Sequence, residues 1–96
     1  MSSLTIKEYA ASALGSNGES MLMLPEPATV KQTPVTFNNQ SAAFQCSWIQ
    51  VQGDAAFRLA FGTNPVSGDL TGEFTYASGV VYTFRVTPGH KLFVNT

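Results

Sequence analysis

Charged side chains are scarce in this chain of 96 residues. Asp, Glu, Lys and Arg together make up 11% of the sequence, whereas globular domains average about 25%. The five basic and six acidic residues give a net charge of -1, which leaves no basic surface for nucleic acid. We therefore expect no nucleic-acid partner and a largely neutral, polar surface, which suits a subunit that lies permanently against other subunits.

Cysteine and histidine each occur once. With Cys46 alone, the chain can form neither an internal disulfide nor a cysteine-based zinc site, and we expect Cys46 to be a small buried apolar residue. No apolar run approaches the roughly 18 residues that span a bilayer, and the N-terminal MSSLTIKEYAAS lacks the basic and apolar regions of a signal peptide. We expect a protein that is made in the cytoplasm and stays soluble, without membrane contact.

Residues capable of catalysis do not form a known motif. His90 lies in the turn sequence TPGHK, and Asp54, Asp69 and Glu73 each lie in or beside a turn signal. The sequence contains no nucleophile elbow, phosphate-binding glycine loop or calcium-loop spacing. We therefore predict no catalytic, metal-binding or cofactor-binding residues, and no enzymatic activity.

Two regions of the chain differ in composition. Pro25, Pro27 and Pro34 precede residue 35, whereas all seven Phe and the single Trp follow it. We interpret residues 1–29 as an N-terminal arm and residues 30–96 as a β domain. Within the arm, LTIKEYAASAL fits either a short helix or an extended segment, and the prolines after MLML prevent a helix or central strand from continuing there.

Short runs of alternating polarity, separated by turn signals, predict antiparallel strands in the second region. The expected fold is all-β: an antiparallel β-sandwich or a jelly-roll-like barrel, preceded by an extended N-terminal arm. The expected strands cover residues 30–37, 41–52, 55–61, 69–76, 80–86 and 91–95. Alternation directs a mostly aromatic and aliphatic set inward, namely Phe57, Leu59, Phe61, Val80, Tyr82, Phe84, Val86, Leu92 and Val94.

One of these strands contains a register conflict. Phe44, Cys46 and Trp48 share one parity, whereas Ile49 and Val51 share the other. A regular strand cannot bury both sets on one face of a sheet, so it must contain a bulge or a break. We expect this irregularity near Ser47.

Several short stretches after residue 30 form a further pattern. They are QSAAF at 40–44 followed by an Ile-Gln-Val strand, FGTNP at 61–65, GVVYTFRV at 79–86 and PGHKLFV at 88–94. This pattern resembles a group of small tailed-bacteriophage proteins in which a β domain follows a proline-containing N-terminal segment. The resemblance covers residues 30–96 and implies a non-enzymatic virion structural protein, a capsid cement or decoration subunit that stabilises the head shell. A head-to-tail connector or tail accessory protein is the alternative, and a carbohydrate- or host-binding module is a third possibility.

The resemblance also implies partners: the major capsid protein or other virion subunits, and further copies of the chain, as a trimer on the particle. We predict that the arm makes the contact, because it has too many apolar residues for a solvated tail. Trp48 and Phe93 alternate against the aliphatic face of their strands, so either both sheet faces are buried or these two residues mark a contact surface. The expected partner-binding residues are Leu4, Ile6, Tyr9, Met21, Leu22, Met23, Leu24, Trp48 and Phe93.

Overall fold

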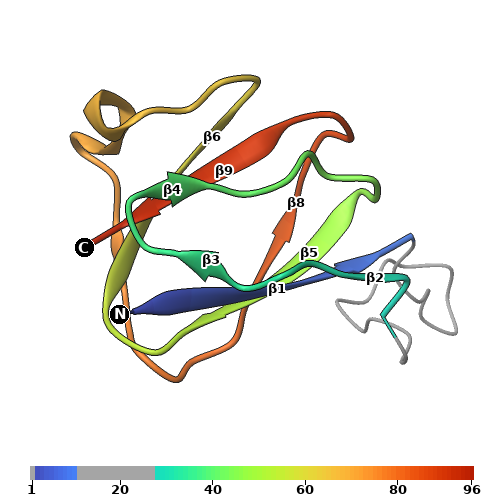
Figure 1. The fold of residues 1–96 in the computed structure, drawn as a ribbon, viewed down its shortest axis with the longest axis horizontal. Helices are drawn as coiled ribbons and strands as arrows, with labels where there is room; N and C mark the ends of the chain where they lie inside the picture. The colour runs from blue at the N-terminus through green and yellow to red at the C-terminus, as the bar shows by residue number, and fades with distance from the viewer. Residues whose placement is uncertain (1, 11–27) are drawn as a thin grey trace, which may run out of the picture.

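The computed structural model describes residues 2–10 and 28–96, and its strands form two antiparallel sheets packed face to face (Figure 1). The first sheet contains β1 (Ser3–Tyr9), β2 (Val30–Lys31), β3 (Val35–Thr36), β5 (Trp48–Gly53) and β8 (Tyr82–Arg85). The second contains β4 (Asn39–Gln40), β6 (Phe57–Gly62), β7 (Thr75–Tyr76) and β9 (Lys91–Asn95). The predicted all-β sandwich is confirmed.

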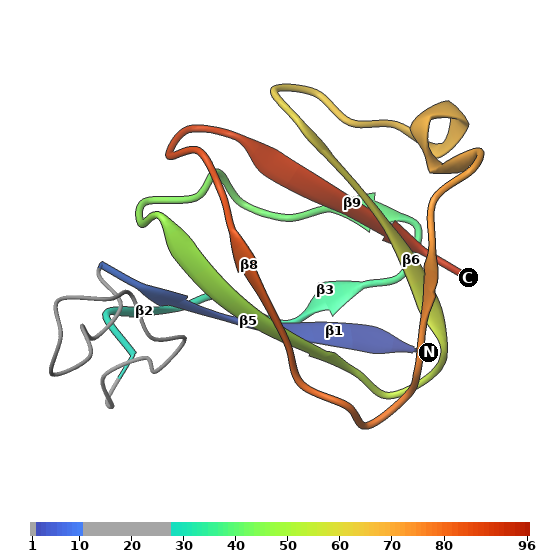
Figure 2. The same cartoon turned by 180° about the vertical axis from the view of Figure 1, so that it is seen from behind.

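The order of the strands gives the sandwich two different sides. In the first sheet β2 and β3 both pair with β1, and β5 and β8 follow; in the second sheet the order is β4, β9, β6, β7. The edge strands β2, β3 and β4 therefore lie on one side, and the edge strands β7 and β8 lie on the other. Figure 2 shows the molecule from the back of the view in Figure 1, where β8 faces the reader. The chain crosses from the second sheet to the first between β7 and β8.

Strand β1 contradicts the predicted boundary between arm and domain. It pairs with β5 from Leu4, opposite Gly53, to Tyr9, opposite Trp48, and it pairs with β2 and β3 on its other edge. Residues 3–9 are therefore an integral, central strand of the sandwich, and the assignment of residues 1–29 to an arm outside the domain is wrong for them. Of the two alternatives for the start of LTIKEYAASAL, the extended one is observed; residues 11–27 lie outside the described residues.

The break expected near Ser47 is present. The chain bends at residues 45–47, and β5 begins only at Trp48. Phe44 and Cys46 are buried before the bend, and Ile49 is buried after it. The bend thus lets both parities reach the interior, and it shortens the predicted strand over 41–52 to Trp48–Gly53.

Two other predicted strands are interrupted. The strand predicted over 30–37 is divided into β2 and β3, and Pro34, which has no N–H for a ladder, lies between them. Most of the strand predicted over 69–76 is wrong, because the 3-10 helix η1 (Ser67–Leu70) and a turn occupy it. The Asp69 carboxylate stabilises that helix by accepting the backbone N–H of Val66 at 2.9 Å.

The main core lies between the sheets and contains the aliphatic residues of β1, β5, β6 and β9, together with Phe44 and the fully buried Phe57. Phe57 contacts the rings of Tyr76 and Tyr82, at centroid distances of 5.4 and 6.1 Å. Two inward predictions need correction. Phe61 is 42% exposed because it lies near the end of β6, and Val80 is 45% exposed because it precedes β8. Tyr82, Phe84 and Val86 pack against the core as predicted, although they are only partly buried.

A second, smaller cluster covers the outer face of the second sheet. Phe93 of β9 and Ala60 of β6 pack there with Leu70 of η1. Both faces of this sheet are therefore covered at Phe93, which was one of the two alternatives for that residue. No helix in the part of the chain that the structure describes is long and apolar enough to cross a membrane.

Candidate functional site

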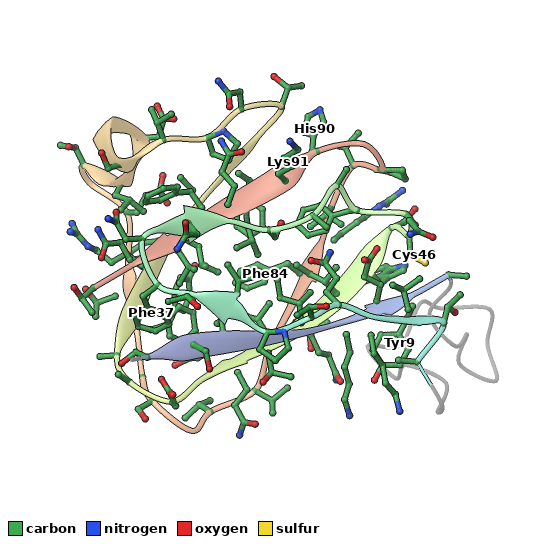
Figure 3. The ribbon with its side chains drawn as sticks, viewed as in Figure 1. Tyr9, Phe37, Cys46, Phe84, His90 and Lys91 are labelled. Atoms are coloured by element: carbon green, nitrogen blue, oxygen red, sulfur yellow. The ribbon has the colours of Figure 1, made fainter. Side chains whose placement is uncertain are left out.

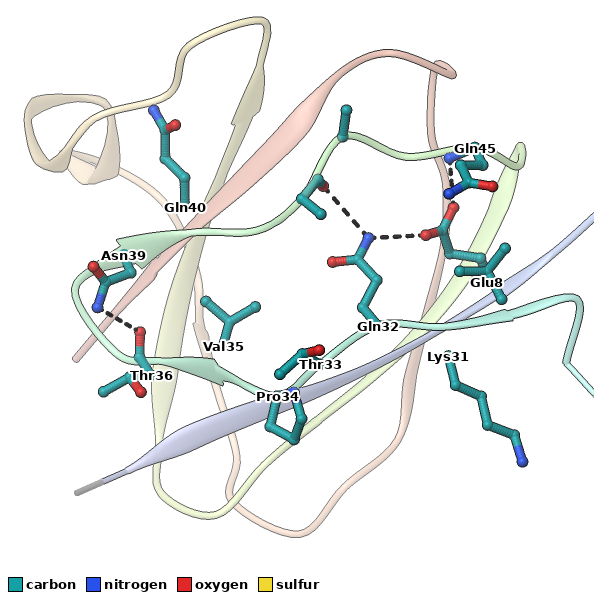
Figure 4. Close-up of a pocket in the computed structure, with 13 residues that line it drawn as sticks. Glu8, Lys31, Gln32, Thr33, Pro34, Val35, Thr36, Asn39, Gln40 and Gln45 are labelled. Atoms are coloured by element: carbon teal, nitrogen blue, oxygen red, sulfur yellow. Dashed lines mark hydrogen bonds between the residues drawn. The ribbon is translucent and has the colours of Figure 1, made fainter.

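A groove of about 620 Å³ opens on the side where the edges of the two sheets approach each other (Figure 4). The segment from β2 to β3 forms one wall, and the segment from β4 to the bend forms the other. Asn38, with φ of 70°, makes the turn that joins β3 to β4 at one end. We call this hollow the edge groove; its lining is Glu8, Val30, Lys31, Gln32, Thr33, Pro34, Val35, Thr36, Asn39, Gln40, Ala42, Ala43 and Gln45.

Glu8 is fully buried at the other end of the edge groove, although it belongs to β1. Its Oε1 accepts the backbone N–H groups of Gln45 and Cys46, at 2.7 and 3.0 Å, and its Oε2 accepts Nε2 of Gln32 at 2.8 Å. Hydrogen bonds to a charged acceptor are stronger than neutral ones, and they offset the cost of burying the carboxylate. Glu8 thereby ties the bend before β5 to β1 and to the opposite wall.

Gln32 crosses the edge groove toward Glu8, as Figure 4 shows. Its Nε2 also lies 3.4 Å from the carbonyl oxygen of Ala42, on the other wall. Its Oε1 is buried and has no hydrogen-bond partner. A buried acceptor without a partner costs about 1–3 kcal/mol, so the groove contains an acceptor whose bonding capacity is unused.

Cys46 is buried beside Glu8, as the sequence predicted for a small apolar residue. Burial raises the pKa of its thiol above the ordinary value, and the nearby negative charge of Glu8 raises it further. Because the thiolate is the reactive form of cysteine, a raised pKa keeps Cys46 in its unreactive form at neutral pH.

The ionisable turn residues are engaged with the backbone and do not converge. Asp54 accepts the N–H of Ser3 at 2.9 Å, and Asp69 caps η1. His90 lies in the turn before β9 (Figure 3). Its backbone N–H donates to the carbonyl of Thr87, and its backbone carbonyl accepts the N–H of Phe44. Within residues 2–10 and 28–96, no three His, Cys, Asp or Glu side chains are grouped so that they could hold a metal ion.

The predicted contact residues occupy different positions from those expected. Leu4, Ile6 and Tyr9 are fully buried within the protein's own first sheet, so the prediction that they contact a partner is wrong. Phe93 is 8% exposed beneath Leu70 and is likewise covered. Trp48 is half-buried, and its role as a contact residue stays a prediction. The remaining four, Met21, Leu22, Met23 and Leu24, lie outside the described residues.

Exposed apolar side chains lie instead in the segments that flank β7 and β8, on the side of the sandwich opposite the edge groove. Phe74 is 78% exposed just before β7, and Val80 and Val81 are 45% and 53% exposed between β7 and β8. We call these three residues the apolar edge. Alternation along the predicted strand places Val80 inward and Val81 on the opposite face; the exposure of Val81 agrees with this prediction, and that of Val80 does not.

The apolar edge adjoins an edge strand. Among the described residues β8 pairs only with β5. The N–H of Val86 donates to the carbonyl of Ser47 at 2.7 Å, and in an antiparallel ladder such bonded pairs alternate with non-bonded ones. The backbone groups of Thr83 and Arg85 therefore point away from β5, toward the open edge.

Comparison of the chain with known protein families, with curated proteins and with solved structures finds no match.

Proposed function

We propose that this protein is a non-enzymatic structural subunit of a tailed-phage virion, of the capsid cement or decoration type, which binds neighbouring subunits through the apolar edge. One observation carries the proposal: exposed Val80 and Val81 directly precede the edge strand β8, whose outward backbone groups are available, and exposed Phe74 precedes the edge strand β7 of the other sheet. Apolar surface of this kind marks protein contacts, and an open edge pairs readily with a strand of another chain.

The low charge of the chain supports this role. A subunit that lies permanently among others gains little from charge repulsion, and only 11% of the residues are charged. The ionisable turn residues Asp54 and Asp69 stabilise the backbone of the sandwich, which is a structural task. The resemblance of residues 30–96 to small phage structural proteins gives the proposal its specific context.

The contact would extend beyond the apolar edge itself. A stable interface buries about 800 Å² on each partner, which three side chains do not supply. Val81 borders a shallow hollow on the outer face of the first sheet, next to Lys7, Gln50 and Gln52. An apolar centre with this polar surround has the composition of a non-obligate protein interface.

A rebinding experiment tests the proposal. Particles that lack the protein are mixed with purified chain and sedimented, and the bound protein is quantified. We expect the parent chain to bind. We expect Val81→Asp to lose at least about tenfold in affinity, which corresponds to about 1.4 kcal/mol of binding free energy. Val66→Asp is the matched control, since Val66 is 48% exposed but lies in another loop. Failure of the parent chain to bind, or equal binding by both variants, would contradict the proposal.

Copy number separates the cement role from its alternatives. A cement subunit is present on a particle in hundreds of copies, whereas a connector or tail protein follows the symmetry of a ring and is present in few. Quantitative mass spectrometry of purified particles, with the major capsid protein as the internal standard, measures this ratio directly. A ratio near one to the capsid protein supports the shell position, and a few copies per particle support the connector or tail position.

A further inference from the structure

The edge groove has unused hydrogen-bonding capacity on both walls. On one wall the N–H of Gln32 donates to Ile6 and that of Phe37 donates to Ser2, so the alternation of an antiparallel ladder directs the backbone of Lys31 and Thr36 away from β1. On the other wall the N–H of Ser41 donates to Leu92, so the backbone of Gln40 points away from β9. Buried Oε1 of Gln32 adds a side-chain acceptor without a partner.

The edge groove contains few charged side chains. Of its lining residues only Glu8 and Lys31 are charged, and both oxygens of Glu8 already accept hydrogen bonds. The other polar side chains of the lining are amides and hydroxyls, and none of the lining residues is aromatic. A ligand that fits this chemistry is uncharged, carries alternating donors and acceptors, and needs no stacking platform.

We infer that the edge groove binds a short, uncharged, extended segment of a partner polypeptide, whose backbone pairs with the strand edges at Lys31 and Gln40 and with the backbone N–H of Thr36, since the carbonyl of Thr36 already accepts Nδ2 of Asn39 at 3.1 Å. An extended chain presents N–H and C=O groups in alternation along its length, which is the pattern that edge strands recognise. We expect the side chains of the bound segment to be small and neutral, because Ala42 and Ala43 make part of one wall exposed and apolar, and the uncharged polar side chains of the lining are amides and hydroxyls. The inference is independent of the proposed virion role, since the apolar edge lies on the opposite side of the sandwich.

Binding is tested with the isolated chain and a displayed library of short linear peptides. Selected peptides are synthesised, and their affinity is measured by fluorescence anisotropy. Their binding site is mapped by the shifts of backbone amide signals in nuclear magnetic resonance spectra. We expect the enriched sequences to be uncharged and rich in Thr, Ser and Val, and the largest shifts to fall on Lys31, Thr36 and Gln40.

Two further measurements make the test specific. Ala43→Trp fills the groove and should weaken peptide binding at least tenfold, whereas Ala56→Trp, at an exposed alanine outside the groove, should leave it unchanged; the unfolding midpoints of both variants verify that they fold. N-methylation of alternate peptide residues removes the donors that would pair with an edge, so it should abolish binding.

Several results would overturn the inference. They are a library without enriched peptides, equal affinity of the two tryptophan variants, or full affinity of the N-methylated peptides. A panel of soluble oligosaccharides provides the contrasting arm: shifts at Lys31, Thr36 and Gln40 with a sugar but not with any peptide would assign the groove to carbohydrate instead.

Discussion

Glu8 shows how a single polar side chain can organise a β-sandwich from within. Alternation along β1 places Glu8 on the same inward face as Leu4 and Ile6, where an acidic residue is costly unless it is hydrogen-bonded. Here the bend before β5 folds over it and supplies two backbone donors. The charge is therefore used to hold the chain at the position where the register of the sequence changes.

Replacement of Glu8 should be costly. In Glu8→Ala the N–H groups of Gln45 and Cys46 and the amide of Gln32 lose their acceptor, and buried donors without partners cost about 1–3 kcal/mol each. We expect the free energy of unfolding to fall by about 2–4 kcal/mol in urea denaturation at neutral pH. Glu8→Gln retains one acceptor oxygen and should lose less. Equal stability of Glu8→Ala and the parent chain would show that these bonds do not stabilise the bend.

The thiol of Cys46 should make stability depend on alkaline pH. Its pKa in the folded protein lies above the ordinary value of 9.0, through burial first and the charge of Glu8 second. The stability that accompanies a raised pKa is fully present below the unfolded pKa and is lost as pH rises through the folded pKa. We expect the free energy of unfolding to fall above about pH 9, and to fall less steeply in Cys46→Ala.

That comparison isolates one group among several, since burial also raises the pKa of Tyr76. Tyr76 is present in both proteins, so its effect cancels in the difference between the two stability curves. Parallel curves for Cys46→Ala and the parent chain would contradict the role assigned to the thiol.

At the scale of elements, β1 is the strand on which the first sheet depends. It lies between β5 on one side and β2 and β3 on the other, and its alternating residues are fully buried in the core. A sheet that loses such a strand loses hydrogen-bonded partners on both sides as well as the apolar surface it buries. The compact domain therefore begins at β1 and not at residue 30.

A pair of substitutions on β1 tests this directly. Ile6→Asp places an unpaired charge in the core and should cost more than about 4 kcal/mol, enough to unfold a domain whose total stability is about 5–15 kcal/mol. Thr5→Asp alters the neighbouring, exposed position of the same strand and should change stability by about 0.5 kcal/mol or less. Circular dichroism during thermal unfolding measures both. If Ile6→Asp melts like the parent chain, β1 is dispensable.

The sequence predicts those elements whose own residues carry enough signal. Strands β6, β8 and β9 follow from strict alternation, and the break near Ser47 follows from a conflict of parity that no regular strand can satisfy. Strand β1 could not be identified from the sequence, because Ile6, Ala10, Ala13 and Leu14 also fit one face of a short helix, and only pairing with β5 selects the extended form. Neither the edge groove nor the apolar edge could be predicted from a local stretch of sequence. Each is formed by strands that are distant in the sequence and become neighbours only in the folded sandwich.

At the scale of the whole molecule, the two open sides of the sandwich differ in chemistry. One side offers amides, hydroxyls and free backbone groups, and the other offers exposed Phe74, Val80 and Val81. A molecule with two chemically different binding surfaces can bind two different partners at the same time. Such an arrangement suits a subunit that is embedded in an assembly.

Self-association of the free chain tests the apolar side. We expect light scattering to give a mass above the monomer value of 10.3 kDa at high protein concentration, because burial of apolar surface favours association. The homo-oligomer predicted for the particle, a trimer, is one such closed form. Val81→Asp should move the population toward the monomer, and Val66→Asp should not. A parent chain that stays monomeric at every concentration would remove the apolar edge as a self-contact.

The interior positions of the first and last strands also determine when this protein can fold. β1 comes first in chain order and β9 last, yet β1 lies within the first sheet and β9 lies between β4 and β6 in the second. Loop closure must precede these distant pairings, and folds dominated by such contacts reach their native state in about milliseconds to seconds. During synthesis the apolar faces of β5 and β6 stay exposed until β9 has been translated. Nascent chains at high local concentration can associate with one another in that interval. The yield of folded protein in a crowded cell is therefore governed by the time needed to close the two sheets.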